Sequence, residues 1–289
     1  MSGIEFVPYP PTSFPYRDLL VLEHIRVEPH HRVCEIGVGS GATTARLARL
    51  CADVTGFEIS EPTVEALRYL EKRQQNLHLV AADITDEDAL AEHAGRFDRA
   101  LSCDTLEHVP DPAGFFRGIA ALLAPGGEAA ITFPNEPTSR MHGVTRFDDP
   151  MELVDHMTAA GFEDVRLGAA RLTPHAERIA QTLGWKPLSM AREAVAVGRA
   201  LIALARAERS KRNGGAVEPP PQTFEETRFF RTMRLWRPLA PAVNLYWFGV
   251  LRLMAARGPT FEIDWDFVDT PFRECQVFAV ARKPRGGAA

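Results

Sequence analysis

The sequence has few cysteines and no long apolar segment, and both scarcities exclude classes of protein. The four cysteines among 289 residues have no short metal-ligand spacing, so neither a disulfide-built scaffold nor a zinc module is indicated. We expect buried free thiols in a reducing compartment. The longest apolar run, residues 238–251, is broken by Asn244 and is shorter than the ~20 residues that a spanning helix needs. The first residues lack the pattern of a secretory signal, so we expect a cytoplasmic protein without a transmembrane segment.

Basic residues are scarce in most of the chain and concentrated in one part of it. The chain has a net charge of −5, with 45% apolar and 25% charged residues. Residues 171–259 hold 15 Lys and Arg against 6 Asp and Glu, a net of +9, which leaves −14 for the remainder. An acidic chain without a known binding motif is not expected to bind nucleic acid. The length predicts roughly two structural units.

Short β-rich runs alternate with helical patterns from residue 32 to about 186, which predicts βαβ units and a parallel sheet. The predicted strands are nearly all apolar, as expected of strands buried on both faces. They cover 32–39, 53–59, 76–83, 97–104 and 127–134, with helices at about 42–51, 61–74, 86–94, 112–123 and 149–160. A sixth strand is predicted after Gly161, and a last strand over 275–282.

A glycine-rich turn, Glu35-Ile36-Gly37-Val38-Gly39-Ser40-Gly41, follows the first strand and directly precedes a helix. Glycines let the backbone turn sharply and approach a ligand, and the helix start offers free amides. We therefore expect a nucleotide-like cofactor there, outside the carboxyl ends of the strands. The same spacing satisfies the dinucleotide fingerprint, so a nicotinamide-dependent oxidoreductase stays open at this point.

Carboxylates recur at the ends of the next two strands. Glu58 closes the second strand, where it could accept hydrogen bonds from ribose hydroxyls. Asp83 closes the third strand, where it could accept from an adenine amine. Either residue could instead be a solvated strand end, but their combination with the glycine turn favours a nucleoside site.

These segments together resemble successive motifs of the class I S-adenosylmethionine-dependent methyltransferases. Two further stretches carry the resemblance, CDTLEHVPD (103–111) and LLAPGGEAAITFPNE (122–136). The resemblance implies an α/β fold, a doubly wound seven-stranded sheet in the order 3-2-1-4-5-7-6 with the last strand antiparallel. The sequence between the sixth strand and the last one itself predicts a mostly helical insert. The implied domains are a Rossmann-like cofactor-binding domain (1–170), a helical lid or substrate insert (171–262) and a final strand (263–289).

The resemblance implies S-adenosylmethionine as cofactor and S-adenosylhomocysteine as product. It assigns the methionine end to the glycine turn, the ribose to the end of the second strand, the adenine to the end of the third and the sulfonium side to the end of the fourth. Tyr16 would close over the cofactor. The other implied cofactor-binding residues are Glu35, Gly37, Gly39, Gly41, Glu58, Ile59, Asp83, Ile84, Cys103 and Asp104.

Two histidines are candidates for catalysis. Methyl transfer needs a positioned nucleophile and a group that removes its proton, and histidine titrates in the right range. His108 is the first candidate general base, although its imidazole could be structural; His142 is the second, and could be a solvent-exposed side chain. His30 and His31 are expected at the surface before the first strand. No residue set has convincing metal spacing, so we expect a metal-free mechanism.

The acceptor is expected to be a small molecule. The segment after the fourth strand resembles quinone-biosynthesis and sugar O-methyltransferases, and it lacks the N/D-P-P-F/Y motif of enzymes that methylate nucleic-acid bases. This favours O-methylation in secondary or quinone and lipid metabolism. The oxidoreductase alternative lacks a Tyr-x-x-x-Lys pair; a non-catalytic S-adenosylmethionine-binding module is the other alternative.

The basic insert could have either of two roles. Arg192, Arg199 and Arg206 share one helical face, and RFFRTMRLWRPL (228–239) interleaves arginines with aromatics. Such a segment could form a lid over a lipophilic or acidic acceptor, or lie on an anionic membrane surface as a peripheral contact. We favour the lid, since the insert immediately precedes the last strand and arginines suit a carboxylate or phosphate.

Overall fold

The computed structural model describes residues 17–39, 41–72, 74–136, 144–185, 240–273 and 275–286. The chain divides into two compact units. The sheet unit consists of Tyr16–Thr173 and Pro259–Ala289, and the helical unit consists of Met1–Pro15 and Pro174–Gly258. The candidate site lies entirely in the sheet unit.

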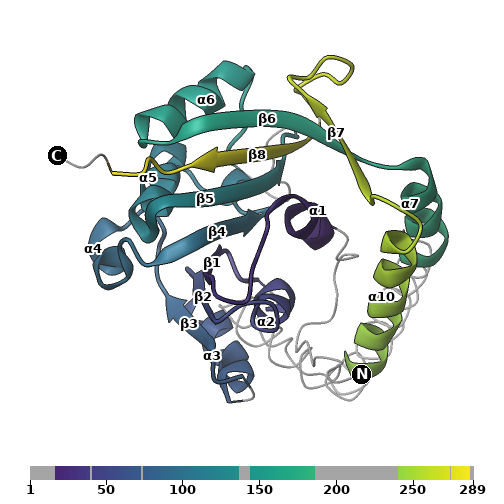
Figure 1. The fold of residues 1–289 in the computed structure, drawn as a ribbon, viewed down its shortest axis with the longest axis horizontal. Helices are drawn as coiled ribbons and strands as arrows, with labels where there is room; N and C mark the ends of the chain where they lie inside the picture. Colours follow the sequence, from purple (N-terminus) through teal and green to yellow (C-terminus); the bar gives the residue numbers. More distant parts are fainter. Residues whose placement is uncertain are drawn as a thin grey trace, which may run out of the picture. The chain divides into compact units, whose positions relative to one another are not determined.

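The sheet unit contains one sheet of eight strands in the order β3-β2-β1-β4-β5-β8-β6-β7 (Figure 1). The pairs β1–β2, β1–β4, β2–β3 and β4–β5 are parallel, and β5–β8, β6–β8 and β6–β7 are antiparallel. This confirms the predicted α/β fold and the antiparallel last strand. The strands are β1 Arg32–Ile36, β2 Asp53–Glu58, β3 Leu77–Ala81, β4 Phe97–Cys103, β5 Leu123–Pro134, β6 Glu163–Leu172, β7 Phe261–Trp265 and β8 Gln276–Arg282.

The predicted count of seven strands is wrong by one. Strand β7, with the sequence FEIDW, pairs with β6 at the edge of the sheet. Its apolar residues alternate with acidic ones, which suits an edge strand with one face buried. The first two residues of this strand fall inside the segment that was predicted to be a helical insert.

Helices cover both faces of the sheet (Figure 1). Because side chains alternate along a strand, neighbouring residues enter different cores. Cys34 and Ile36 join the core under α4, α5 and α6, whereas Val33 joins the core under α1, α2 and α3. The helices are α1 Arg17–His24, α2 Ala42–Leu47, α3 Glu61–Glu71, α4 Glu87–Leu90, α5 Pro112–Leu122 and α6 Pro150–Ala159, with short 3₁₀ turns η1 Ala91–His93 and η2 Leu106–His108.

Aspartates begin the helices that follow β3, β4 and β5. Asp86 accepts from the N–H groups of Asp88 and Ala89, Asp111 from that of Gly114 and Asp149 from that of Met151. Proline follows at the first position of α5 and of α6, where its missing N–H has no cost. These caps fix where each connection leaves the carboxyl edge of the sheet.

The helical unit contains α7 Pro174–Ile179, the π-helix η3 Ala180–Trp185 and α10 Ala240–Ala255. The hydroxyl of Tyr246 in α10 donates to the carbonyl of Leu183 in η3, at 2.5 Å. Arg192, Arg199, Arg206 and the stretch 228–239 lie outside the described residues, so the predicted roles of the insert stay predictions. Within the ranges that the structure describes, no helix is both long and apolar enough to cross a bilayer.

The burial of the cysteines and of His31 can be compared with the predictions from the sequence. Cys34, Cys51 and Cys275 are buried free thiols, as predicted, whereas Cys103 is only half-buried. Burial raises the pKa of Cys51 and of Cys275 to about 11. His31 was expected at the surface, and this is wrong, because only 7% of it is exposed. Its Nδ1 accepts from the Glu28 N–H at 2.9 Å, which ties the ring into the loop before β1.

Candidate functional site at the carboxyl edge of the sheet

The glycine turn leaves β1 and is bound to both neighbouring strands. The Gly37 N–H donates to the carbonyl of Phe57 in β2 at 2.8 Å. The backbone φ is +79° at Gly37, +52° at Gly39 and +75° at Gly41, so each occupies the left-handed region that favours glycine. A Cβ at Gly37 would lie 2.1 Å from Thr105 Oγ1, whereas one at Gly39 would meet nothing within 4 Å. The turn is therefore packed tightly at its base and open at Gly39.

Glu58, at the end of β2, bridges the glycine turn and the start of the next helix. Its Oε2 accepts from the Gly39 N–H and its Oε1 from the Ser60 N–H, both at 3.1 Å. Its carbonyl accepts from the N–H of Ala82, which directly precedes Asp83, at 3.0 Å. The ends of β1, β2 and β3 are thus joined by hydrogen bonds to the side chain and the backbone carbonyl of Glu58.

Asp83, just after β3, has one carboxylate oxygen that is bound by described residues and one that is not. Asp83 Oδ1 accepts from the N–H and the hydroxyl of Thr85, at 2.9 and 2.8 Å, whereas Oδ2 has no hydrogen bond with any described residue. Ile59 is 70% exposed next to Glu58. The Ile84 side chain is buried in the core, so Ile59 offers an apolar surface at this edge and Ile84 does not.

Glu35 lies beneath the turn and is buried. Its Oε2 accepts from the hydroxyl of Thr44 in α2 at 2.5 Å. A buried carboxylate needs such partners, because an unpaired charge in the interior is costly. The contact fixes α2 against the end of β1, directly behind the glycines.

The segment after β4 joins the turn from the other side. The Thr105 hydroxyl lies 3.2 Å from the carbonyl oxygens of both Ile36 and Cys103. Asp104 has a left-handed φ of +51°, which is uncommon outside glycine and is held by the contacts around it. Its Oδ1 accepts from Gln276 Nε2 at 3.0 Å, and the same amide donates to Thr132 Oγ1 at 2.7 Å.

His108 projects from the 3₁₀ turn η2 at the same edge. Its N–H donates to the carbonyl of Thr105 at 2.9 Å, and its side chain is 58% exposed. His108 Nε2 lies 3.7 Å from Oε1 of Glu107, a carboxylate that is only 3% exposed. An exposed imidazole beside a buried carboxylate is suited to exchange protons with a bound molecule.

Residues 144 and 145, which follow β5 in the sequence, form hydrogen bonds with the η2 turn. The N–H groups of Val144 and Thr145 donate to the carbonyl of Glu107, at 2.7 and 2.9 Å. The Thr145 hydroxyl donates to the carbonyl of Val109 at 2.6 Å. His108 therefore has a fixed backbone on both sides.

The structure brings most of the sequence-predicted site residues to one edge and leaves two undescribed. Tyr16 and His142 lie outside the described residues. Gln276 and Thr145 were not found from the sequence, because their partners are 172 and 36 residues away and no local pattern marks them.

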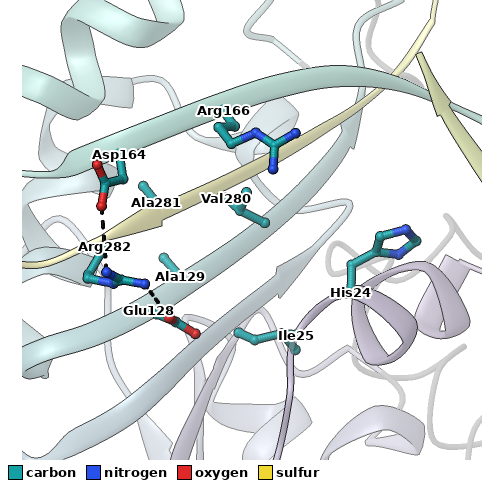
Figure 2. A pocket seen from close by; sticks show the side chains of 9 residues that line it. All are labelled: His24, Ile25, Glu128, Ala129, Asp164, Arg166, Val280, Ala281 and Arg282. Atoms are coloured by element: carbon teal, nitrogen blue, oxygen red, sulfur yellow. Dashed lines mark hydrogen bonds and ion pairs between the residues drawn. The ribbon is translucent and has the colours of Figure 1, made fainter. Parts of the chain in front are cut away.

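A pocket of about 240 Å³ lies elsewhere in the sheet unit (Figure 2). Its lining residues come from the end of α1 and from β5, β6 and β8. Figure 2 shows Arg282 between Asp164 and Glu128, with nitrogen–oxygen distances of 3.6 and 3.1 Å. Arg99 also contacts Glu128, at 3.4 Å. These charges neutralise one another across β4, β5, β8 and β6, so we interpret them as a network that stabilises the strand ends.

Three possible metal ligands, Glu28, His30 and His31, lie within 4.8 Å of one another before β1. His31 Nδ1 already accepts from the Glu28 N–H, and Arg26 Nε lies 2.7 Å from Glu28 Oε1. In a neutral ring an accepting Nδ1 places the proton on Nε2, which then cannot bind a metal. These contacts account for the cluster as loop structure.

Most of the residues at the carboxyl edge of the sheet lie in a part of the chain that matches a known protein family. The family described as Methyltransferase domain matches residues 34–131, which include the glycine turn, Glu58, Asp83 and His108. This part of the chain is thus similar to that family's domain. The nicotinamide-dependent oxidoreductase is therefore not favoured.

Two curated proteins that are similar to part of this chain have the same name. A ubiquinone biosynthesis O-methyltransferase of Psychrobacter cryohalolentis is 35% identical over 130 residues, which cover 44% of this chain and 50% of the relative. A protein of the same name from Caulobacter sp. strain K31 is 40% identical over 96 residues, or 33% of this chain and 38% of the relative. The chain thus spans about half or less of the length of these relatives.

A solved structure resembles the chain beyond the methyltransferase domain. The crystal structure of the [4+2]-cyclase SpnF matches 93% of this chain and 81% of that chain, with a TM-score of 0.52 and 18% identity. At this identity the likeness shows the fold alone. Since that protein is named a cyclase, the reaction has to be argued from the site of this chain.

Proposed function

We propose that the chain is an S-adenosylmethionine-dependent methyltransferase that methylates a hydroxyl oxygen of a small molecule. The observation that carries the proposal is the convergence, at one sheet edge, of an open glycine turn, the Glu58 carboxylate and the exposed His108 imidazole. The methyltransferase domain over residues 34–131 supports the same reaction. The names of the relatives support oxygen as the methylated atom.

The residues at the edge fit a nucleoside with a cationic sulfur. The turn is open at Gly39, Ile59 offers an exposed apolar side chain and Asp83 Oδ2 is available as an acceptor. Glu58 binds two backbone N–H groups, and each oxygen keeps a second lone pair for a ribose hydroxyl. When bound, the cofactor supplies an electrophilic methyl group on a positively charged sulfur. Asp104, at the end of β4, would contribute a negative charge to that side of the site.

His108 is proposed as the general base. Its exposed ring can accept the hydroxyl proton of the acceptor, which makes the oxygen nucleophilic. The Glu107 carboxylate oxygen Oε1 lies 3.7 Å from His108 Nε2, on one side of the ring. With Nε2 facing Glu107, Nδ1 is the atom that would take the proton.

The acceptor is proposed to be small and acidic or lipophilic. The net charge of +9 over residues 171–259 supports an acidic group. His142, in the loop after β5, is proposed to border the acceptor, and Tyr16 to close over the cofactor. The insert is proposed as the lid over this acceptor.

The test combines ligand binding with methyl transfer. We expect S-adenosylhomocysteine to raise the melting temperature of the protein and NADH to leave it unchanged. With labelled S-adenosylmethionine and catechol-type acceptors, His108→Gln should lower turnover by about 10²- to 10⁴-fold. The affinity of the His108→Gln variant for S-adenosylhomocysteine should equal that of the unmodified protein. Absence of S-adenosylhomocysteine binding would remove the proposal, and a fully active His108→Gln variant would remove the role of His108.

A further inference from the structure

Arg146 is a cation that no described residue neutralises. Its Nε is buried without a hydrogen-bond partner, although the side chain as a whole is half-buried. Throughout the ranges that the structure describes, no carboxylate forms an ion pair with Arg146. Burying a guanidinium N–H without a hydrogen-bond partner is unfavourable. We therefore expect a bound molecule to supply the partner.

The acidic residues that follow Arg146 in sequence are already engaged. Asp148 Oδ1 lies 3.2 Å from Arg273 Nη2. Asp149 accepts from the Met151 N–H at 2.8 Å and caps α6. Neither of these two carboxylates forms an ion pair with Arg146.

Arg146 directly follows a residue that binds the turn of the proposed base. Thr145, the preceding residue, donates from its N–H to Glu107 and from its hydroxyl to Val109, on the two sides of His108. Phe147, the following residue, is buried and held by Asn135. Arg146 is thus fixed between two anchored residues, within one residue of the contact with the His108 turn.

From this geometry we infer that Arg146 binds an oxyanion, a carboxylate or a phosphate, on the methyl acceptor. The inference rests on the proposed function and names the acceptor class. An oxyanion would satisfy the buried Nε–H and neutralise the guanidinium, with two parallel hydrogen bonds available from Nε and one Nη. Val144, two residues earlier, is 60% exposed and adds an apolar side chain to the same segment. The acceptor is accordingly an acidic molecule with an apolar body, held with its hydroxyl near His108.

The experiment measures equilibrium binding to protein saturated with S-adenosylhomocysteine. The probes are 3,4-dihydroxybenzoate and phenyl phosphate, with 3,4-dihydroxybenzamide and phenol as their neutral counterparts. We expect the unmodified protein to bind at least one anion about 10-fold or more tightly than its neutral counterpart. Arg146→Gln should weaken the binding of that anion about 10- to 100-fold and leave the neutral probe unchanged. Which anion is preferred tells whether the site takes a carboxylate or a phosphate.

Arg273→Gln is the matched control, because Arg273 contacts the same loop but is paired with Asp148. It should keep the preference for the anion, and Arg146→Lys should keep part of it. The inference is overturned if the unmodified protein does not prefer either anion, or if Arg146→Gln binds the anion as tightly. Failure to bind S-adenosylhomocysteine would instead overturn the proposed function, so the two failures are distinguishable.

Discussion

Gly37 shows how one residue sets the form of the cofactor turn. It combines a φ of +79° with a position where a Cβ would lie 2.1 Å from the hydroxyl oxygen of Thr105. The Thr105 hydroxyl lies within hydrogen-bond distance of the carbonyl of Ile36, so it cannot move away without losing that contact. The close approach of β1 and the segment after β4 therefore depends on the missing side chain.

Gly37→Ala should destabilise the protein and abolish S-adenosylhomocysteine binding. The left-handed backbone costs about 1–2 kcal/mol for a residue with a Cβ, and the overlap with Thr105 adds about 1–3 kcal/mol. Gly95→Ala is the control, since Gly95 has a φ of +66° but open space around it. Urea denaturation of both variants measures the difference, and equal losses in the two would contradict the packing argument.

Single site residues could be predicted from the sequence where their neighbours in the chain mark them. The glycines, Glu58 and Asp83 could be predicted because each follows a strand within a few residues. Gln276 and Thr145 could not, because their hydrogen bonds depend on which distant segments become neighbours. The burial of His31 was missed for the same reason, since the sequence around it is that of an exposed loop.

Among the elements, the end of β5 depends on Asn135. This fully buried side chain donates to the carbonyls of Phe147 and Phe272 and accepts from the Phe147 N–H, at 2.9 to 3.0 Å. Its own N–H donates to the carbonyl of Cys275 at 2.8 Å. One amide thus joins β5 to the loop that carries Arg146 and to the approach to β8.

Asn135→Ala should lower the free energy of unfolding by about 2–4 kcal/mol, because three side-chain hydrogen bonds are lost and buried carbonyls stay unsatisfied. Asn76→Ala is the comparison, since Asn76 is half-buried and donates to two carbonyls, those of Ala48 and Cys51. We expect a smaller loss there, measured by denaturant unfolding. A loss at Asn135 no greater than at Asn76 would show that the amide does not hold the loop.

Most elements could be predicted from their apolar runs, and β7 shows why one was missed. Its five residues alternate in hydrophobicity as a strand should, but they follow a long stretch with helical composition, and the first two were assigned to that stretch. The strand is an edge strand that depends on β6 for its hydrogen bonds. Its assignment therefore needs the position of β6, which the local sequence does not contain.

For the whole molecule, burial of histidine makes stability depend on pH. Desolvation by burial lowers the pKa of His31 from its ordinary value of 6.5, and the nearby Arg99 lowers it further. Burial likewise lowers the pKa of His93. Between the lowered pKa and 6.5 the unfolded chain binds more protons than the folded one, so the free energy of unfolding decreases as pH falls through that range.

We expect the melting temperature to fall between pH 7.5 and 5.5, and to fall less in His31→Asn. The asparagine amide can still accept the Glu28 N–H but does not titrate. His30→Asn should keep most of the decrease, because the ring of His30 is exposed. Thermal unfolding at several pH values measures this, and an unchanged pH profile in His31→Asn would contradict the role of its burial.

The order of the strands has a consequence for how the chain is made. Strand β8 is the last along the chain, yet it lies between β5 and β6 and pairs with both. During synthesis these two strands cannot complete their backbone hydrogen bonds until residue 282 has left the ribosome. The nascent sheet unit should accordingly expose two unpaired strand edges until β8 has emerged, and a chaperone would bind it during that time.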